Sequence, residues 1–176
     1  MISSNHSKIS LRSIERYDLK QIQLWRNLKS IQPFVREYKE LSMDHIESWY
    51  DAMIQNPKFE FFIIEDTKQR SIGVTGLTYI DWVNRHADLH LGLYNEDWGC
   101  KEWGLPTMEV MLDYGFNHLN LNKIYAEIYA IDIQKLGLFK DYGFKVDASL
   151  REHYYHKGEY VTSHILSILK SEYEKH

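Results

Sequence analysis

Alternating and helical patterns of apolar residues predict a strand and a helix at the start of the chain. Apolar and polar positions alternate over residues 8–14, with Ile9 and Leu11 on one side, as in a half-buried strand. Asp18 has the type of side chain that caps a helix, and Gln21 three residues later completes a capping-box pattern. One face of the helix that follows carries Leu19, Ile22 and Trp25 or Arg26.

The second predicted helix has the clearest pattern in the sequence. Ser42 can cap its free N–H groups, Asp44 is favourably placed in its first turn, and Asn56-Pro57 ends it. Between these limits, apolar residues recur with the i, i+3, i+4, i+7, i+8 spacing of one buried helix face. They are Ile46, Trp49, Tyr50, Met53 and Ile54.

Three strands joined by short polar turns are predicted next. Residues 59–65 are nearly all apolar, residues 66–70 form a polar turn, and residues 71–82 form a second strand. After another turn, apolar residues alternate with polar ones over positions 87–94. Because the turns are short, these strands are expected to pair as an antiparallel meander.

The remainder of the chain alternates between helices and strands. Gly104-Leu105-Pro106 leads into a helix at about residues 107–119, and Pro106 suits the first helical position. Residues 123–129 form a strand. Asp132 can cap the next helix, and Gly143 is its expected left-handed stop.

A hairpin closes the predicted fold. Residues 154–169 fold back on themselves through Lys157-Gly158. The resulting order β-α-α-β-β-β-α-β-α-β-β predicts the α/β class, with a mixed sheet. No linker or internal repeat divides the sequence, so residues 1–176 are expected to form a single domain.

Composition and charge narrow the class of protein. The chain has 176 residues, of which 44% are hydrophobic, as expected for a globular domain with a sizeable core. Its net charge of −4 does not suit a nucleic-acid binder, so no nucleic-acid partner is expected. Cys100 is the only cysteine, which excludes a disulfide within the chain, and we predict no metal site.

The sequence also bears on location and assembly. Residues 1–6 lack a basic segment followed by an apolar one, so no signal peptide is predicted. No apolar run reaches membrane-spanning length, and we therefore expect a cytoplasmic protein without a membrane partner. The oligomeric state is left open, with a homodimer as one option.

Several short sequence motifs follow one another in a specific order and spacing along the chain. They are Trp25-Arg26-Asn27, Gly76-Leu77, Asn84-Arg85-His86-Ala87-Asp88, Leu112-Asp113-Tyr114-Gly115-Phe116-Asn117, Leu119-Asn120-Leu121-Asn122-Lys123-Ile124, Tyr142-Gly143-Phe144 and Gly158-Glu159-Tyr160. Together they resemble the GNAT superfamily, and its RimJ/RimL-like branch in particular, over about residues 8–173. The resemblance implies the GNAT acyl-CoA N-acyltransferase fold and acetyl-CoA as the co-substrate.

The segment from Gly99 to Gly104 is the expected cradle for the coenzyme pyrophosphate. It lies between a strand and a helix, and a helix N-terminus offers an anion unpaired N–H groups and about half a positive charge. A Walker A loop is excluded, because Leu105-Pro106 follows where Lys and Ser or Thr are required. The predicted coenzyme contacts are Gly99, Cys100, Lys101, Glu102, Trp103, Gly104 and Leu105.

Two departures from the family pattern stand out. The family's Q/R-x-x-G-x-G/A loop has Glu102 here in place of its middle glycine, which is unfavourable beside a pyrophosphate unless the carboxylate points away or Lys101 offsets it. The Asn and Tyr that the family often places on the following helix correspond to Asp132 and Phe139. The tyrosine usually assigned to protonate the departing thiolate is therefore absent, although Asp132, Lys135 and Phe139 stay in the predicted coenzyme set.

The expected reaction is direct attack of a neutral amine on the thioester. Backbone N–H groups around Leu91 and Leu93 are expected to hold the carbonyl oxygen. Asp88 and His90 share one face of their strand and are the candidate bases, against the alternatives of a turn residue and a partly buried structural ring. Asp81, on the facing strand, is a weaker candidate for the substrate site.

Three further groups have a chemical and a structural interpretation. Tyr142 could replace the missing acid, but its spacing is also that of a core residue. Cys100 could carry an acyl group, but no activating partner is recognisable, and a spare loop residue is the simpler reading. The acceptor side is predicted to include Trp25, Arg26 and Asn27, with helix-end packing as the alternative.

The leading hypothesis is acetyl transfer to a primary amine of a small molecule or peptide. The RimJ/RimL-like resemblance favours a protein N-terminal α-amine. A nucleotide-linked amino sugar is the nearest alternative, and a polyamine is ranked behind it because residues 35–40 are not clearly acidic. A catalytically inert, CoA-binding module is the alternative from another class, motivated by Glu102, Asp132 and Phe139.

Overall fold

A computed structural model describes residue 2 and residues 8–35, 39–94 and 101–174, except for the side chain of Lys101. Seven strands form one sheet in the order β1-β2-β3-β4-β5-β7-β6. They are β1 (Ile9–Ser13), β2 (Glu60–Asp66), β3 (Ser71–Asp81), β4 (His86–Leu93), β5 (Lys123–Tyr129), β6 (Lys145–His156) and β7 (Glu159–Leu169). All neighbouring strands are antiparallel except β4 and β5, which are parallel.

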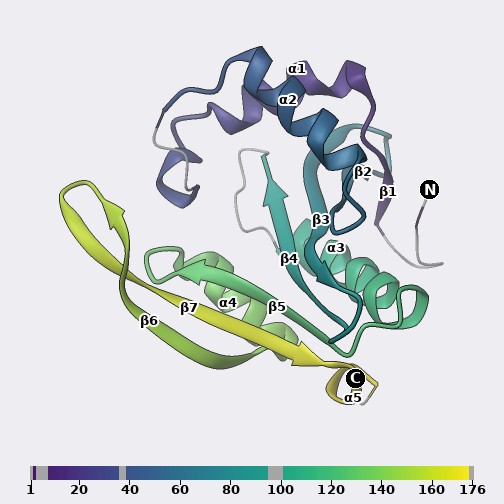
Figure 1. Ribbon diagram of the computed structural model, residues 1–176, viewed down its shortest axis with the longest axis vertical. Helices are drawn as coiled ribbons and strands as arrows, with labels where there is room; N and C mark the ends of the chain where they lie inside the picture. Colours follow the sequence, from purple (N-terminus) through teal and green to yellow (C-terminus); the bar gives the residue numbers. More distant parts are fainter. Residues whose placement is uncertain (1, 3–7, 36–38, 95–100, 175–176) are drawn as a thin grey trace.

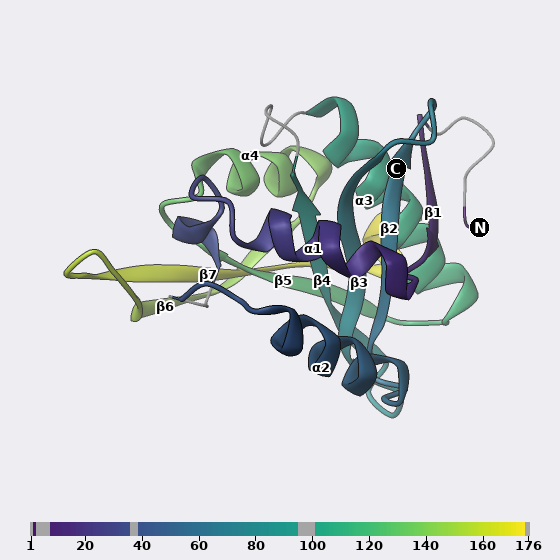
Figure 2. The same cartoon turned by 90° about the horizontal axis from the view of Figure 1, so that it is seen from above.

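Helices cover both faces of this sheet (Figures 1 and 2). They are α1 (Leu19–Arg26), α2 (Met43–Ile54), α3 (Lys101–Asp113), α4 (Ile133–Tyr142) and α5 (Lys170–Tyr173), with 3-10 turns at Arg16–Asp18 and Gln32–Phe34 and a π-helical turn at Tyr114–His118. One apolar core joins the sheet to α3 and α4, and a second joins its other face to α1 and α2. Within the described parts of the chain, no helix combines the length and apolar character needed to cross a bilayer.

The parallel pair β4–β5 opens partway along its length. Its three paired positions are His86 with Lys123, Ala87 with Ile124, and Asp88 with Tyr125. Beyond Asp88 the two strands diverge (Figure 1). The sheet is therefore interrupted at its centre, although β3 still pairs with β4 and β7 with β5 over this stretch.

The two faces of this opening differ chemically, because successive residues of a strand face opposite sides. The apolar residues of β4 and β5 pack into the core beneath α3 and α4. They are Ala87, Leu89, Leu91, Leu93, Ile124, Ala126 and Ile128. The residues between them therefore face α1 and α2, and these include Asp88, His90, Tyr125 and Glu127.

A buried ionic cluster anchors α1 to the sheet. The guanidinium of Arg12 on β1 donates to both carboxylate oxygens of Asp18, at 2.7 and 2.8 Å, and to Glu65 of β2 at 2.7 Å. The side chains of Asp18 and Glu65 are only 7% and 11% exposed. The two carboxylates, Asp18 above all, raise the pKa of Arg12, which stays charged.

The predicted fold class and order of elements are confirmed, and so are three of the predicted helix ends. Ser42 accepts from the backbone N–H of His45, and Asp132 accepts from that of Lys135 at 3.1 Å. Gly143 ends α4 in the left-handed region with φ 114°.

The capping bond predicted for Asp18 is wrong, and so are two predicted boundaries, although Asp18 does occupy the N-cap position of α1. The Asp18 side chain does not cap α1, because its carboxylate is engaged by Arg12 and by the N–H of Glu15. The last hairpin is longer than residues 154–169, since β6 begins at Lys145. The helix predicted from residue 107 begins at Lys101, which leaves Pro106 inside α3 at the expense of one bond to the Glu102 carbonyl.

Candidate active site

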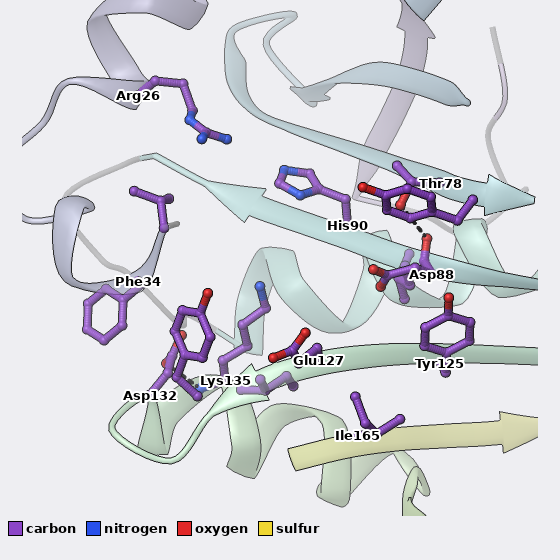
Figure 3. Close-up of a pocket in the computed structure, with 15 residues that line it drawn as sticks. Arg26, Phe34, Thr78, Asp88, His90, Tyr125, Glu127, Asp132, Lys135 and Ile165 are labelled. Atoms are coloured by element: carbon purple, nitrogen blue, oxygen red, sulfur yellow. Dashed lines mark hydrogen bonds between the residues drawn. The ribbon is translucent and has the colours of Figure 1, made fainter. Parts of the chain in front are cut away.

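A cavity of about 420 Å³ lies where β4 and β5 diverge, and we call it the β4–β5 cavity (Figure 3). Elements far apart in the sequence supply its polar side chains. They are Arg26 from α1, Asp88 and His90 from β4, Glu127 from β5, and Asp132 and Lys135 from the start of α4. Aromatic rings from β3 and β5 complete much of the wall, among them Tyr79, Tyr125 and Tyr129.

Charges of both signs meet in this cavity. Asp88, Glu127 and Asp132 provide carboxylates, whereas Arg26 and Lys135 provide cations. Burial raises the pKa of Asp132 and lowers the pKa of Lys135, while each partly offsets the effect on the other. The pKa values of Asp132 and Lys135 therefore lie closer together than those of a carboxyl and an ammonium group in water, which makes proton transfer between the two easier.

His90 is a neutral, partly buried ring rather than a strong base. Its ring meets Phe61 edge-on, with 5.5 Å between centroids. Burial, together with the cations Lys135 and Arg26, lowers the pKa of His90 to about 3. At neutral pH it would hold an abstracted proton poorly, so the structure disfavours the predicted base role for His90.

Asp88 is the last residue of β4 that pairs with β5, so it lies at the edge of the opening. It lies within the strand and not in the turn, and its backbone carbonyl accepts a bond from the Thr78 hydroxyl at 3.4 Å. Its carboxylate lines the cavity close to Tyr125, whose pKa is raised by burial and by Asp88 (Figure 3). Asp88 is therefore the better placed of the two predicted bases.

Asp81 has a structural role in the β3–β4 turn. Its carboxylate accepts from the backbone N–H groups of Val83 and Asn84 at 3.0 and 2.7 Å, and from the Asn84 side chain at 2.9 Å. These bonds hold the pKa of Asp81 below its usual value. Asp81 is not among the residues that line the β4–β5 cavity, so its predicted substrate contact is not supported.

The tyrosine proposed as an acid and the phenylalanine in the family's tyrosine position both lie away from the cavity. Tyr142 packs edge-on against Phe144, with centroids 6.4 Å apart, and burial raises its pKa. Phe139 is fully buried and also meets Phe144, at 4.8 Å. Neither ring lines the β4–β5 cavity, because both point into the core that α4 forms with the sheet.

Only one residue of Trp25-Arg26-Asn27 enters the cavity. Trp25 is buried and stacks on Tyr94, with centroids 5.1 Å apart. The Asn27 side chain donates to the Leu41 carbonyl and accepts from the Leu41 N–H, at 2.9 and 2.8 Å. Helix-end packing thus explains Trp25 and Asn27, while Arg26 lines the cavity.

The predicted coenzyme segment lies partly at the start of α3. Gly99 and Cys100 fall outside the described residues. Lys101, Glu102, Trp103, Gly104 and Leu105 form the beginning of the helix rather than a loop. A Cβ at Gly104 would lie 2.7 Å from the Leu138 side chain, so this glycine allows α3 to pack against α4.

The start of α3 nevertheless fits a pyrophosphate. The first backbone N–H groups of a helix lack intrahelical partners, and within α3 these are the groups of residues 101–103. The side chains of Leu91 and Leu93 are buried in the core, so only their backbone could meet a thioester, and their role stays a prediction. Glu102 is exposed, which lets its carboxylate point into solvent.

Replacing Glu102 with glutamine is expected to lower the KM for acetyl-CoA about two- to fourfold. The change removes a negative charge from the turn that faces the phosphates, an effect of about 0.5–1 kcal/mol at an exposed site. Initial rates at low and high ionic strength measure it, because the gain should shrink in salt. Glu109→Gln, on an exposed position of the same helix, is the control. An unchanged KM at low salt would place the phosphates elsewhere.

Sequence reasoning missed Glu127, Tyr125 and Tyr129, and it predicted Lys135 only as a coenzyme contact. The signal for the three β5 residues was available, since polar residues alternate with apolar ones along Lys123–Tyr129. Glu127 also lies 3.5 Å from His153 of β6. The sequence does not indicate which strand lies beside these β5 residues, because β4 and β5 pair over a long distance along the chain.

A mixed sheet whose central parallel pair opens onto a charged cavity, beside the N-terminus of a helix, is the architecture of a GNAT acyl-CoA N-acyltransferase. A family model described as an acetyltransferase (GNAT) domain matches residues 11–165. The chain belongs to this family and is an N-acetyltransferase.

The chain is similar to several proteins named as spermidine acetyltransferases. Spermidine N(1)-acetyltransferase from Vibrio cholerae serotype O1 is 29% identical over 168 residues, covering 96% of each chain. The enzyme of that name from Escherichia coli K12 is 25% identical, covering 97% of this chain and 90% of the other. A crystal structure of the Vibrio cholerae spermidine N-acetyltransferase with CoA and spermine matches with a TM-score of 0.88 and 28% identity, over 95% and 98% of the two chains. The RimJ/RimL-like assignment gains no support from these relatives.

Proposed function

We propose that the chain transfers the acetyl group of acetyl-CoA to a primary amine of a spermidine-like polyamine bound at the β4–β5 cavity. The observation that carries this proposal is the set of three carboxylates in that cavity: Asp88, Glu127 and Asp132. Aliphatic polyamines are cationic at neutral pH, so carboxylates would attract and orient them. The names of the two spermidine acetyltransferase relatives support the same acceptor class.

The two substrates would approach from opposite faces of the sheet. The start of α3, where the pyrophosphate would bind, lies on the side of the α3–α4 core, whereas Asp88 and Glu127 face α1 and α2. In this proposal the two substrates meet at the opening between β4 and β5. The thioester carbonyl would therefore meet the amine in the opening itself, beside the backbone of Leu91.

Deprotonation is the main demand on the acceptor side. Keeping an alkylamine of pKa about 10.4 neutral at pH 7 costs about 4–5 kcal/mol. Asp88 would take the proton that the acceptor nitrogen sheds, since it is the carboxylate at the edge of the opening. Glu127 would attract the cationic remainder of the acceptor and Arg26 would repel it, so the two together would orient it.

An acceptor panel tests the proposed substrate class. Thiol release from acetyl-CoA is measured with spermidine, spermine, an N-terminal peptide and a nucleotide-linked amino sugar, and the acetylated product is confirmed by mass spectrometry. We expect kcat/KM for a polyamine to exceed that for the peptide at least tenfold, with a polyamine KM that rises with ionic strength. Faster transfer to the peptide would restore the α-amine hypothesis. Tight CoA binding with no turnover on any amine would identify an inert module.

A further inference from the structure

Lys135 has an unusual position for a lysine. It lies in the first turn of α4, where the helix dipole disfavours a cation, and its side chain is partly removed from solvent. In Figure 3 its ammonium nitrogen rises from α4 into the space between β4 and β5. A partly buried cation at the wrong end of a helix costs stability, which suggests a functional reason for keeping it.

Lys135, like its neighbour Asp132, comes from the opposite face of the sheet to the other charged groups of the cavity. Asp88, His90 and Glu127 face the α1–α2 side of the sheet, but α4 belongs to the core on the opposite side. To line the same cavity, the Lys135 side chain must reach into the opening of the sheet. That opening is where the thioester has to meet the amine, if acetyl-CoA enters from the side of α3.

Thioester aminolysis needs a proton donor at this point. As the C–S bond breaks, the sulfur leaves as a thiolate, and a thiol of ordinary pKa about 8.5 is more easily expelled when protonated. Phe139, one turn further along α4, has no proton to give, and Tyr142 packs into the core. Within the described part of α4, Lys135 is the protonated side chain that lines the β4–β5 cavity.

We propose that Lys135 is the catalytic acid that protonates the departing thiolate of coenzyme A. The acceptor nitrogen forms its bond to the carbonyl carbon, the C–S bond breaks, and the Lys135 ammonium gives a proton to the sulfur. The proton shed by the acceptor nitrogen, taken first by Asp88, then restores the ammonium. The products are the amide and the free thiol, so no proton is gained or lost overall from a neutral amine.

The groups around Lys135 are compatible with this exchange. Those lining the same cavity are Asp132 on α4, Asp88 and His90 on β4, Tyr125, Glu127 and Tyr129 on β5, Tyr79 on β3, and Arg26 on α1. Burial lowers the pKa of Lys135, while Asp132 and Asp88 oppose that change. A lowered pKa makes the ammonium a stronger acid. Because the acid form is the active one, the rate should fall as pH rises through a value below the ordinary lysine pKa of about 10.4.

The first test needs no acceptor, so it is independent of the proposed polyamine substrate. The pKa of the thiol of bound CoA is followed by thiolate absorbance in wild type and Lys135→Met, both carrying Cys100→Ser so that the chain itself contains no thiol. An ammonium beside the sulfur should lower the thiol pKa by about 1 pH unit or more relative to Lys135→Met. Equal thiol pKa values in the two proteins would overturn the proposal.

The second test separates proton donation from charge alone. With the best amine of the acceptor panel, Lys135→Met should lose at least 30-fold in kcat while its KM for acetyl-CoA stays within threefold. Lys135→Arg keeps the charge but cannot release a proton, so it should keep the lowered thiol pKa and still lose kcat. Full kcat in Lys135→Arg, or a Lys135→Met effect confined to KM, would instead indicate an electrostatic anchor and contradict the proposal.

A matched control comes from the exposed face of the same helix. Lys140→Met makes the same chemical change at an exposed position of α4 and should leave kcat and the thiol pKa unchanged. Thermal unfolding and CoA affinity of each variant show that the fold and the coenzyme site are intact.

Discussion

Asp88→Asn is expected to lower kcat/KM for the polyamine acceptor about 100-fold, the lower end of the effect of a general base. The amide has the size of the carboxylate but can neither accept the amine proton nor attract the cation. Because Asp88 lies at the edge of the β4–β5 opening and not in the core, the KM for acetyl-CoA should stay within about threefold. Steady-state thiol release at varied acceptor concentration measures both quantities.

Asp113→Asn is the matched control for this variant. Asp113 is a partly exposed carboxylate on α3 that accepts from the Asn117 side chain at 2.8 Å, and it does not line the cavity. Its replacement should leave kcat/KM within about twofold. If Asp88→Asn lost less than tenfold, the amine proton would have to leave directly to solvent, and Asp88 would not be the general base.

Arg12→Leu is expected to lower the free energy of unfolding by about 3 kcal/mol. The change leaves Asp18 and Glu65, which are 7% and 11% exposed, without the cation that donates three hydrogen bonds to them. For a chain of this length the melting temperature should fall by about 6–12 °C. Urea unfolding followed by circular dichroism gives the free energy.

A surface arginine provides the comparison for Arg12. Arg16 pairs with Asp51 at 2.7 Å, but their side chains are 64% and 48% exposed. Arg16→Leu should therefore cost less than about 1 kcal/mol. Equal effects of the two substitutions would mean that the Arg12 cluster contributes no more than a solvated ion pair, contrary to its burial.

The parts of the fold that could be predicted from sequence depend on neighbouring residues. Ser42 and Asp132 each bond an N–H three residues away, and Gly143 adopts the backbone region that glycine favours. Such signals are local and survive in any context. Asp18 shows the limit of this reasoning, because a distant partner, Arg12, takes the carboxylate that a local pattern assigns to the helix.

The start of α3 could not be located for a similar reason. Pro106 favours a helix that begins at the proline, and Gly104 favours a loop. In the structure Gly104 serves instead to let Leu138 of α4 approach. That packing joins two helices that a sequence pattern cannot place side by side.

The candidate site was predicted in part. Asp88 was identified from its position on an alternating strand, and Arg26 from its phrase at the end of α1. The placement of Glu127 and the proposed role of Lys135 depend on the parallel β4–β5 pairing and on the gap that follows it, which are long-range properties. Neither helical nor strand periodicity contains that information.

The gap between β4 and β5 has a consequence for how the enzyme is loaded. A pit on one face would force both substrates through one mouth, so that whichever entered first obstructed the other. In the proposed two-sided arrangement, each substrate would enter and leave from its own face of the sheet. Such an arrangement requires no acetylated intermediate on the protein. A single compound that joined the coenzyme to a polyamine would then occupy both substrate sites at once.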